Sequence, residues 1–360
     1  MESHYQPVYE FTRGDAFQEL HNQIVESVHY GALAIVDARG SLLASAGDPY
    51  TVTYLRSTAK PFQALPFLEH GGKEFYQLTE QDIALICSSH SGTDQHYQAV
   101  LELQAKTGVS ESDLLCGFHP PLHEPTALAL KQRGEQPTPN RHNCSGKHTG
   151  MVAYARMLNL DYKEYINPNH PIQQIIRATF AQMCDLPVEN IVVGTDGCSA
   201  PNFAIPLYNA ALAYARLCDH QTNEKEPAAR IEACRQITQA MMAHPEMVGG
   251  PDRFDTRLMQ AAKGKLVSKG GAEGYQGIGI MPGTFSEGSP AIGIALKISD
   301  GDLRGRAIAA VTLEVLRQLQ ILNPVELGEL ADFGPIVTLQ NFRNFTVGYG
   351  KPNFELNRGG

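Results

Sequence analysis

Short apolar runs broken by turn residues dominate both ends of the chain. Residues 31–36 and 41–45 are apolar runs that flank a turn-type sequence at 37–40, which predicts a β-hairpin. The same pattern returns late in the chain, where strands are predicted at 277–281, 291–298 and 344–347, a turn at 299–302 and a helix at 304–319. Strand-forming sequence therefore lies at the two ends.

The middle of the chain has apolar residues at helical spacing instead. Helices are predicted at 63–68, 95–106, 148–158, 172–184, 208–217 and 228–243. The simplest assembly is an α/β (α+β) fold in which both chain ends build one antiparallel sheet flanked by helices, with a helical lobe inserted and a cleft between them. We expect one catalytic unit, residues 1–360, with a sheet lobe at 1–60 and 262–360 and a mainly helical lobe at 61–261.

Composition narrows the class of partner. The net charge is -9 and charges of both signs are interspersed, so no basic stripe for nucleic acid or anionic lipid is present. A small-molecule substrate is the better expectation. The amino terminus lacks a signal-peptide pattern, no window supplies about 18 apolar residues, and the seven cysteines include no C-x-x-C pair. We therefore expect a cytoplasmic protein without a membrane partner.

The sharpest local signal is the segment RSTAKP at residues 56–61, which follows the first strands and opens a predicted helix. Residues three apart share one face of a helix, so the Lys60 amine can reach the Ser57 hydroxyl. A neutral lysine can take a serine proton when burial or a nearby cation lowers its pKa from about 10.4 toward neutrality. Taken alone, the segment fits a helix-capping serine and a solvated lysine better, so the prediction depends on other segments.

Two further segments complete a candidate serine–lysine site. An apolar run at 83–87 leads into SSHSG at 88–92, and Lys269 stands beside two glycines before strand-like sequence. The order Ser-x-x-Lys, serine-bearing loop and Lys-small-Gly resembles that of serine β-lactamases and penicillin-binding proteins, although their S-D-N and K-T-G sequences are absent. We expect two pairs, Ser57 with Lys60 and Ser89 with Lys269, to face each other across a cleft.

Two loops carry candidate metal ligands. Cys144 and Lys147 open one predicted helix, and Cys198 follows an apolar run at 191–193. Two thiolates and a nitrogen donor suit Zn²⁺, and lysine can join only as the neutral amine. The alternative is two unrelated buried cysteines, which spacing alone favours because lysine is a rare ligand. Further candidate ligands, or neighbours of ligands, are His90, His142 and His148.

Six motifs together resemble the third class of L-asparaginases, the thermolabile type similar to the inducible rhizobial enzyme. They are RSTAKP at 56–61, SSHS at 88–91, NCSGKH at 143–148, GTDGC at 194–198, HPEMV at 244–248 and RFDT at 253–256. The resemblance spans nearly the whole chain. It implies a fold related to serine β-lactamases and glutaminases, a homodimer, and hydrolysis of L-asparagine to L-aspartate and ammonia.

The resemblance also implies roles for single residues. The catalytic residues would be Ser57, Lys60, Ser89 and Lys269, and the zinc ligands would be Cys144, Lys147 and Cys198. Arg56 is suited to binding the substrate α-carboxylate, and Asp196 to binding the α-ammonium group. The predicted substrate-binding set also includes His90 and Lys147. Residues 92–94 depart from the family pattern, so the resemblance does not extend to the contacts of this loop or to the range of substrates that the protein accepts.

Our hypothesis is that Ser57, deprotonated by Lys60, attacks the asparagine side-chain carbonyl, while Ser89 and Lys269 relay protons. Ser89 is the alternative nucleophile, and direct attack by zinc-bound hydroxide is the alternative mechanism. Two other functions stay open. One is a glutaminase or β-lactamase-like acyl hydrolase on the same scaffold, and the other is a non-catalytic, zinc-stabilised binding protein.

Overall fold

The computed structural model describes residues 4–18, 20–221 and 227–358. Within them, a nine-stranded antiparallel sheet has the order β10-β11-β1-β2-β9-β8-β7, and β3 pairs with both β2 and β12. The strands are β1 (Gln6–Asp15), β2 (His21–Asp37), β3 (Leu42–Ala46), β7 (Leu266–Gly271), β8 (Tyr275–Ile280), β9 (Ile292–Ile298), β10 (Val337–Gln340), β11 (Thr346–Pro352) and β12 (Asn357–Arg358). The predicted mixed α/β fold, with a sheet from both chain ends, is confirmed.

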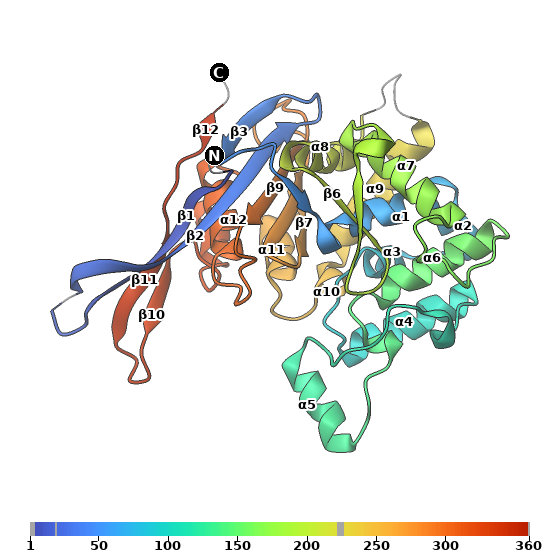
Figure 1. Cartoon of the computed structure of the whole chain (residues 1–360), viewed down its shortest axis with the longest axis horizontal. Helices are drawn as coiled ribbons and strands as arrows, with labels where there is room; N and C mark the ends of the chain where they lie inside the picture. Colours follow the sequence, from blue (N-terminus) through green and yellow to red (C-terminus); the bar gives the residue numbers. More distant parts are fainter. Residues whose placement is uncertain (1–3, 19, 222–226, 359–360) are drawn as a thin grey trace.

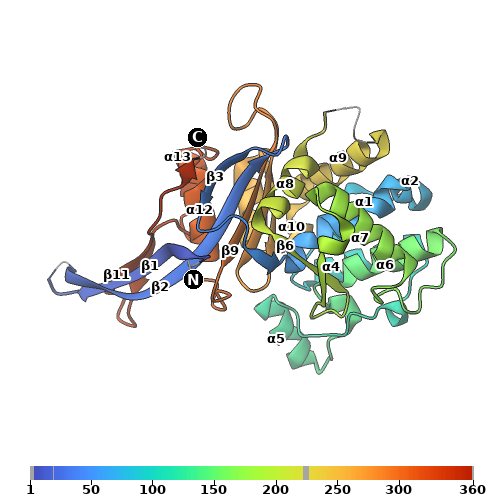
Figure 2. The ribbon, with the colours of Figure 1, turned by 45° about the horizontal axis from the view of Figure 1, so that its top comes forward.

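Most helices come from the middle of the chain, two follow β9, and they lie beside the sheet (Figures 1 and 2). They are η1 (Arg56–Ala59), α1 (Lys60–Glu69), α2 (Gly72–Tyr76), α3 (Glu80–Ile86), α4 (Asp94–Thr107), η2 (Glu111–Asp113), α5 (Glu124–Arg133), η3 (Pro139–Arg141), α6 (Ser145–Met157), α7 (Pro171–Cys184), η4 (Val188–Asn190), α8 (Leu207–Cys218), α9 (Ala228–Ala243), α10 (Pro245–Val248), α11 (Phe254–Ala262), α12 (Ile308–Gln318) and α13 (Pro324–Gly328). A small antiparallel sheet lies among them, with the order β4 (Val52–Tyr54), β6 (Pro201–Pro206), β5 (Val192–Thr195). None of the described helices is both long and apolar enough to cross a bilayer.

The helix predicted at 304–319 begins later than its apolar spacing suggests. The Asp302 carboxylate accepts hydrogen bonds from the backbone N–H groups of Arg306, Ala307 and Ile308, at 2.8, 2.9 and 2.8 Å. The chain therefore wraps around this carboxylate before α12 starts at Ile308. A side-chain acceptor at the end of a helix satisfies N–H groups that have no partner inside the helix.

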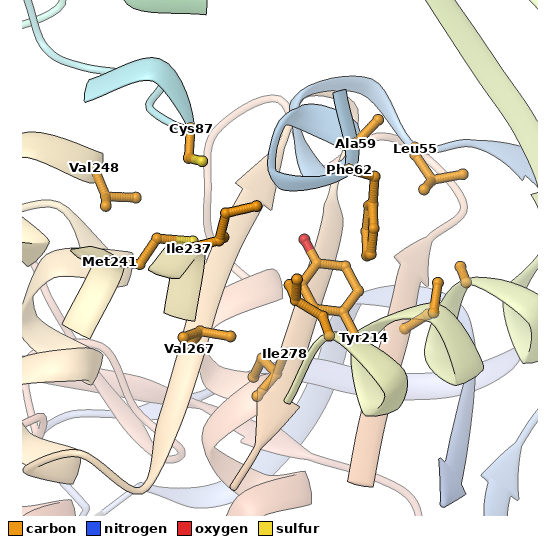
Figure 3. Close-up of a cluster of buried hydrophobic side chains, with 14 of the residues drawn as sticks. Leu55, Ala59, Phe62, Cys87, Tyr214, Ile237, Met241, Val248, Val267 and Ile278 are labelled. Carbon is orange, nitrogen blue, oxygen red and sulfur yellow. The ribbon is translucent and has the colours of Figure 1, made fainter. Parts of the chain in front are cut away.

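Helix α8 packs unusually close to the large sheet because glycines face it. A Cβ on Gly293 would lie 1.8 Å from the Ala211 carbonyl oxygen, and one on Gly277 would lie 2.3 Å from the Tyr214 ring. These positions must lack a side chain for α8 to pack there. Tyr214 then reaches across the core toward Phe62 and Ala59 (Figure 3). Its hydroxyl donates a 2.8 Å hydrogen bond to the Thr58 carbonyl. The core thus fixes the turn that carries Ser57.

Candidate active site

A pocket of about 290 Å³ lies where η1, the loop after α3, the start of α11 and the end of β7 meet. Its wall contains both serines that the sequence predicts, Ser57 and Ser89. We call it the serine pocket. It is also lined by Leu122, Asn143, Arg253, Phe254, Asp255, Gly270, Gly271, Ala272, Tyr275, Gln276 and Ile308. Its size suits a small molecule rather than a polymer.

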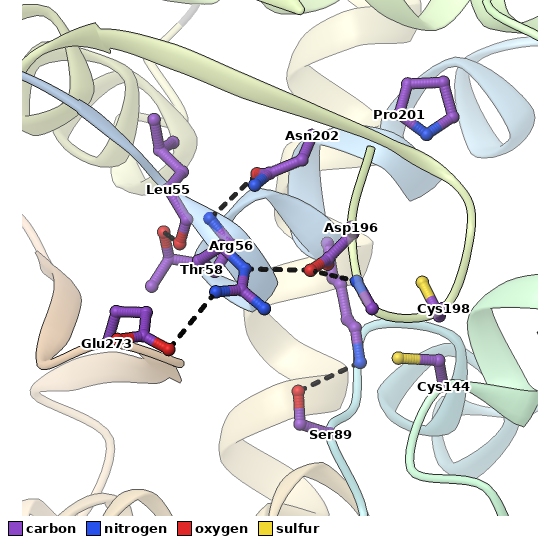
Figure 4. A network of polar contacts seen from close by, with 12 residues as sticks. Leu55, Arg56, Thr58, Ser89, Cys144, Asp196, Cys198, Pro201, Asn202 and Glu273 are labelled. Atoms are coloured by element: carbon purple, nitrogen blue, oxygen red, sulfur yellow. Dashed lines mark hydrogen bonds and ion pairs between the residues drawn. The ribbon is translucent and has the colours of Figure 1, made fainter. Parts of the chain in front are cut away.

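The Ser89 hydroxyl lies between two lysine amines. Lys60 Nζ is 2.9 Å from Ser89 Oγ, and Lys269 Nζ is 2.8 Å from the same oxygen. All three side chains are buried, with Ser89 7% exposed and each lysine 1% exposed. Figure 4 shows Ser89 in the same region as Arg56, Asp196 and the two cysteines Cys144 and Cys198. The three residues come from α1, the loop after α3, and β7, so tertiary structure brings together the predicted set.

The two lysines differ in their hydrogen bonds. Lys60 Nζ also donates to the carbonyl oxygens of Ser88, at 2.5 Å, and Asn143, at 3.3 Å, so it uses three donors as an ammonium does. Burial lowers the pKa of Lys269 to about 7; the Asp255 carboxylate opposes this effect, and Lys60 reinforces it. Near neutral pH, a neutral Lys269 can accept the Ser89 proton, while its own N–H donates to the Gly270 carbonyl at 2.8 Å.

Among the described residues, Ser57 lacks the one contact that was predicted for it, a hydrogen bond with Lys60. It lies in η1, partly exposed in the pocket wall. No hydrogen bond of its hydroxyl is found with any residue that the structure describes, and Lys60 is bonded to Ser89 instead. The more accessible hydroxyl therefore belongs to Ser57, and the one held by lysines to Ser89. Which of them reacts stays a prediction.

Arg56, the predicted carboxylate-binding residue, is held by protein carboxylates. Its Nε donates to Asp196 Oδ1 at 2.8 Å, and one of its terminal nitrogens lies 3.8 Å from Glu273 (Figure 4). Its backbone has φ 54°, a left-handed conformation, and its N–H donates to Asn202 at 3.0 Å. The same contact engages Asp196, the predicted α-ammonium ligand. Both residues are thus paired with each other in this structure.

His90, another predicted substrate-binding residue, is buried away from the pocket wall. Its Nδ1 accepts the Gly92 N–H at 3.1 Å, and its Nε2 lies 2.8 Å from Ser145 Oγ. Burial, reinforced by the neighbouring His96, lowers its pKa well below the usual value. The structure therefore places His90 as a neutral support beneath the site rather than on the pocket surface.

Cys144, Lys147 and Cys198, which we call the cysteine cluster, do come together. Lys147 Nζ lies 3.0 Å from Cys198 Sγ, and all three side chains are buried. The hydrogen bond from Cys144 and the charge of Lys147 lower the pKa of Cys198 strongly, against the effect of burial. These contacts favour the thiolate form of Cys198, which is the form that binds zinc.

The donor set of the cysteine cluster fits a zinc ion. Two sulfurs and one amine converge, and the nearby His148 Nε2 is buried with no hydrogen-bond partner of ordinary geometry among the described residues. Within residues 4–18, 20–221 and 227–358, this cluster included, no three His, Cys, Asp or Glu side chains gather as a metal site, so the third donor here is the Lys147 amine. Zinc binding here would need the Lys147 proton to leave. Occupancy by zinc stays a prediction.

Asp255 lies in the site, although no role was predicted for it from the sequence. Its carboxylate accepts hydrogen bonds from Ser268 Oγ at 2.7 Å, Gly270 N–H at 2.7 Å and Gln276 Nε2 at 2.9 Å. Burial would raise its pKa, but Lys269 and these hydrogen bonds hold the pKa below the ordinary value. Asp255 lies in the RFDT motif. The sequence signal for its role was therefore a charged residue within a motif that resembles the asparaginase family.

Comparison with known proteins adds a family match. A sequence model of the family described as L-asparaginase II matches residues 18–351. A search of curated proteins finds no match. A probable glutaminase from Bacillus subtilis, complexed with 6-diazo-5-oxo-L-norleucine, is 10% identical with a TM-score of 0.37, over 86% of this chain and 89% of that chain. Native Mglu in 4.3 M NaCl is 12% identical with a TM-score of 0.35, over 81% and 61%.

Proposed function

The chain belongs to the L-asparaginase II family, and we propose that it hydrolyses the side-chain amide of L-asparagine to L-aspartate and ammonia. Membership of this family supports amidohydrolase activity, and the assignment of L-asparagine as the substrate is our proposal. The observation that carries it is the Ser89 hydroxyl between Lys60 and Lys269, 2.9 and 2.8 Å from their amines, in the wall of a pocket that also contains Ser57.

The first step needs a base for the attacking hydroxyl. Lys60 donates to Ser89 Oγ, and Ser89 can donate its own proton to a neutral Lys269. Two proton transfers along this relay, from Lys60 to Ser89 and from Ser89 to Lys269, leave Lys60 neutral. Ser57 precedes Lys60 by three residues and is partly exposed in the pocket wall, so we assign Lys60 as the base for its proton. This division of roles uses both serine–lysine pairs.

The chemistry then proceeds in two halves. Ser57 Oγ bonds to the side-chain carbonyl carbon, and the C–N bond breaks as a lysine returns its proton to the leaving nitrogen, which departs as ammonia. The product is an ester between Ser57 and the substrate acyl group. A water molecule, deprotonated by the same lysines, attacks this ester and releases L-aspartate. Attack by Ser89 itself is the alternative within the same pocket.

The cysteine cluster is proposed to hold Zn²⁺ through Cys144, Lys147 and Cys198. When bound, the ion would supply a fixed positive charge and tie α6 to the loop between β5 and β6. Cys144 follows Asn143 directly, whose carbonyl accepts from Lys60 at 3.3 Å. The residues that hold the metal therefore also help to position the relay.

The cytoplasmic location and the homodimer stay proposals from the sequence. All seven cysteines are buried, and none of Cys87, Cys116, Cys144, Cys184, Cys198 and Cys218 forms a disulfide, which suits a reducing compartment. The family resemblance alone supports the dimer.

A substrate panel tests the proposed function. Purified protein is assayed for ammonia release from L-asparagine and L-glutamine and for opening of a chromogenic β-lactam, with Ser57→Ala as the matched background. We expect turnover of L-asparagine to exceed that of the other two and to fall at least about a thousandfold in Ser57→Ala. Faster turnover of glutamine or the β-lactam would contradict the asparagine assignment. Binding of metal without any turnover would favour a non-catalytic zinc protein.

A further inference from the structure

Arg253 is a charged residue of the serine pocket that the mechanism above does not use. It lies directly before α11, its side chain is exposed, and it forms part of the pocket wall. Its guanidinium has no hydrogen bond or ion pair with any residue in the described part of the chain. Its positive charge also contributes to lowering the pKa of Lys269, which places it close to the relay.

The nearest acidic group in the pocket wall does not neutralise Arg253. Asp255 directs its two carboxylate oxygens to Ser268, Gly270 and Gln276 at 2.7 to 2.9 Å. Arg253 and Asp255 are the two charged residues of the wall as the structure describes it. The pocket thus presents one unpaired cation, with Asp255 turned to the protein.

Arg56, unlike Arg253, is paired with a protein carboxylate. It is the arginine that the sequence suggested for the α-carboxylate, but Asp196 already holds its Nε at 2.8 Å. It is also absent from the described wall of the serine pocket. A substrate carboxylate would have to compete with the Asp196 carboxylate there. At Arg253 none of the described residues is such a competitor, and an unpaired guanidinium can bind a carboxylate through two parallel hydrogen bonds.

We propose that Arg253 binds the α-carboxylate of the amino-acid substrate and thereby positions its side-chain amide at Ser57. The inference rests on the proposed amidohydrolase function and names the residue that selects a substrate with a free carboxylate. Arg56 then has a different role, in holding Asp196 and the loop that carries Cys198. A substrate without the carboxylate gains nothing from Arg253.

The experiment compares two amides in wild-type and variant proteins. The substrates are L-asparagine and β-alaninamide, which is asparagine without its α-carboxylate. In Arg253→Gln we expect KM for L-asparagine to rise about 10- to 100-fold with a much smaller change in kcat. The Arg253 charge also lowers the pKa of Lys269, so the assays are run at about pH 9, where the Lys269 amine is neutral in both proteins. Turnover of β-alaninamide should then stay at its wild-type level. Arg253→Lys should recover part of the loss, and free guanidinium ion should partly rescue Arg253→Gln.

Arg257→Gln is the matched control, because Arg257 lies one turn along α11 and donates to the Glu329 carbonyl at 2.9 Å, outside the pocket wall. An unchanged KM in Arg253→Gln, or an equal loss of activity on both amides, would overturn the inference. The proposed function would still stand if the wild-type protein hydrolysed L-asparagine. If wild-type protein released no ammonia from L-asparagine, the proposed function would fail first and the inference with it.

Discussion

The amine of Lys269 lies 2.8 Å from the hydroxyl oxygen of Ser89. Lys269 belongs to β7 at the edge of the large sheet, and Ser89 to the loop after α3 in the helical part, so this bond joins the two parts of the molecule across the serine pocket. Lys60 approaches the same oxygen at 2.9 Å. Two charged amines buried this close together would repel each other, so Lys60 lowers the pKa of Lys269. We therefore expect the two lysines to share one positive charge.

The shared charge predicts the pH dependence of turnover. Burial lowers the pKa of Lys269 to about 7, helped by Lys60 and Arg253 and opposed by Asp255. The neutral amine accepts the Ser89 proton, so activity should grow as pH rises through about 7. Below that value kcat/KM should fall about tenfold per pH unit, and above it the rate should level off. A pH profile of kcat/KM that stays flat from about pH 5 to about pH 8 would contradict the relay.

Replacing Asp255 by asparagine should move that profile. The Asp255 charge raises the pKa of Lys269, so Asp255→Asn should lower it and shift the rise in activity to lower pH, by about one to three pH units. The asparagine carbonyl can still accept the Gly270 N–H. A purely structural role of Asp255 would lower the rate equally at all pH values. Asp252→Asn, at an exposed position outside the described pocket wall, is the matched control.

The close packing of α8 on the sheet predicts a sharp stability effect. A Cβ added at Gly293 would lie 1.8 Å from the Ala211 carbonyl oxygen and 2.6 Å from the Ala215 nitrogen. Backbone must move, so Gly293→Ala should lower the free energy of unfolding by at least about 3 kcal/mol, or abolish folding. Gly328→Ala is the control, since nothing lies within 4 Å of its added Cβ. Equal denaturant midpoints for the two variants would refute the packing described here.

Metal content tests the cysteine cluster without relying on activity. Elemental analysis of protein purified with zinc present should find about one zinc ion per chain. Cys198→Ser should lose it, because the thiolate beside Lys147 is removed. Cys184→Ala, at a buried cysteine at the end of α7, should keep it. Zinc retained by Cys198→Ser, or absent from the wild type, would show that these residues are not its ligands.

Most of the fold could be predicted from periodicity, and the exceptions have physical reasons. The hairpin of β2 and β3 was predictable because apolar runs flank a turn. Strand β1 was not predicted, because it lies in a protruding arm where partly exposed residues interrupt the apolar pattern. Most of the apolar run at 83–87 lies in α3, which ends at Ile86. This helix was not predicted, because a short apolar run alone does not distinguish a helix from a strand. A Thr79–Asp82 capping box was the overlooked signal.

The candidate site was predictable as a set of residues but not as a set of contacts. Spacing suggested that Lys60 bonds Ser57, because residues three apart share a helical face. The Ser88 and Asn143 carbonyls instead draw the Lys60 amine to Ser89, and these acceptors come from distant segments. The unpaired state of Arg253 was likewise invisible, because it depends on where Asp255 directs its oxygens.

In the proposed mechanism, Ser57 carries the acyl group while Lys60, Ser89 and Lys269 move protons. The most direct test is mass spectrometry of peptides from enzyme quenched with a slowly hydrolysed ester analogue of L-asparagine. We expect the peptide containing Ser57 to gain the acyl mass and the Ser57→Ala variant to gain none. An acyl group on Ser89, or product formation with no acylated serine at any time, would contradict it.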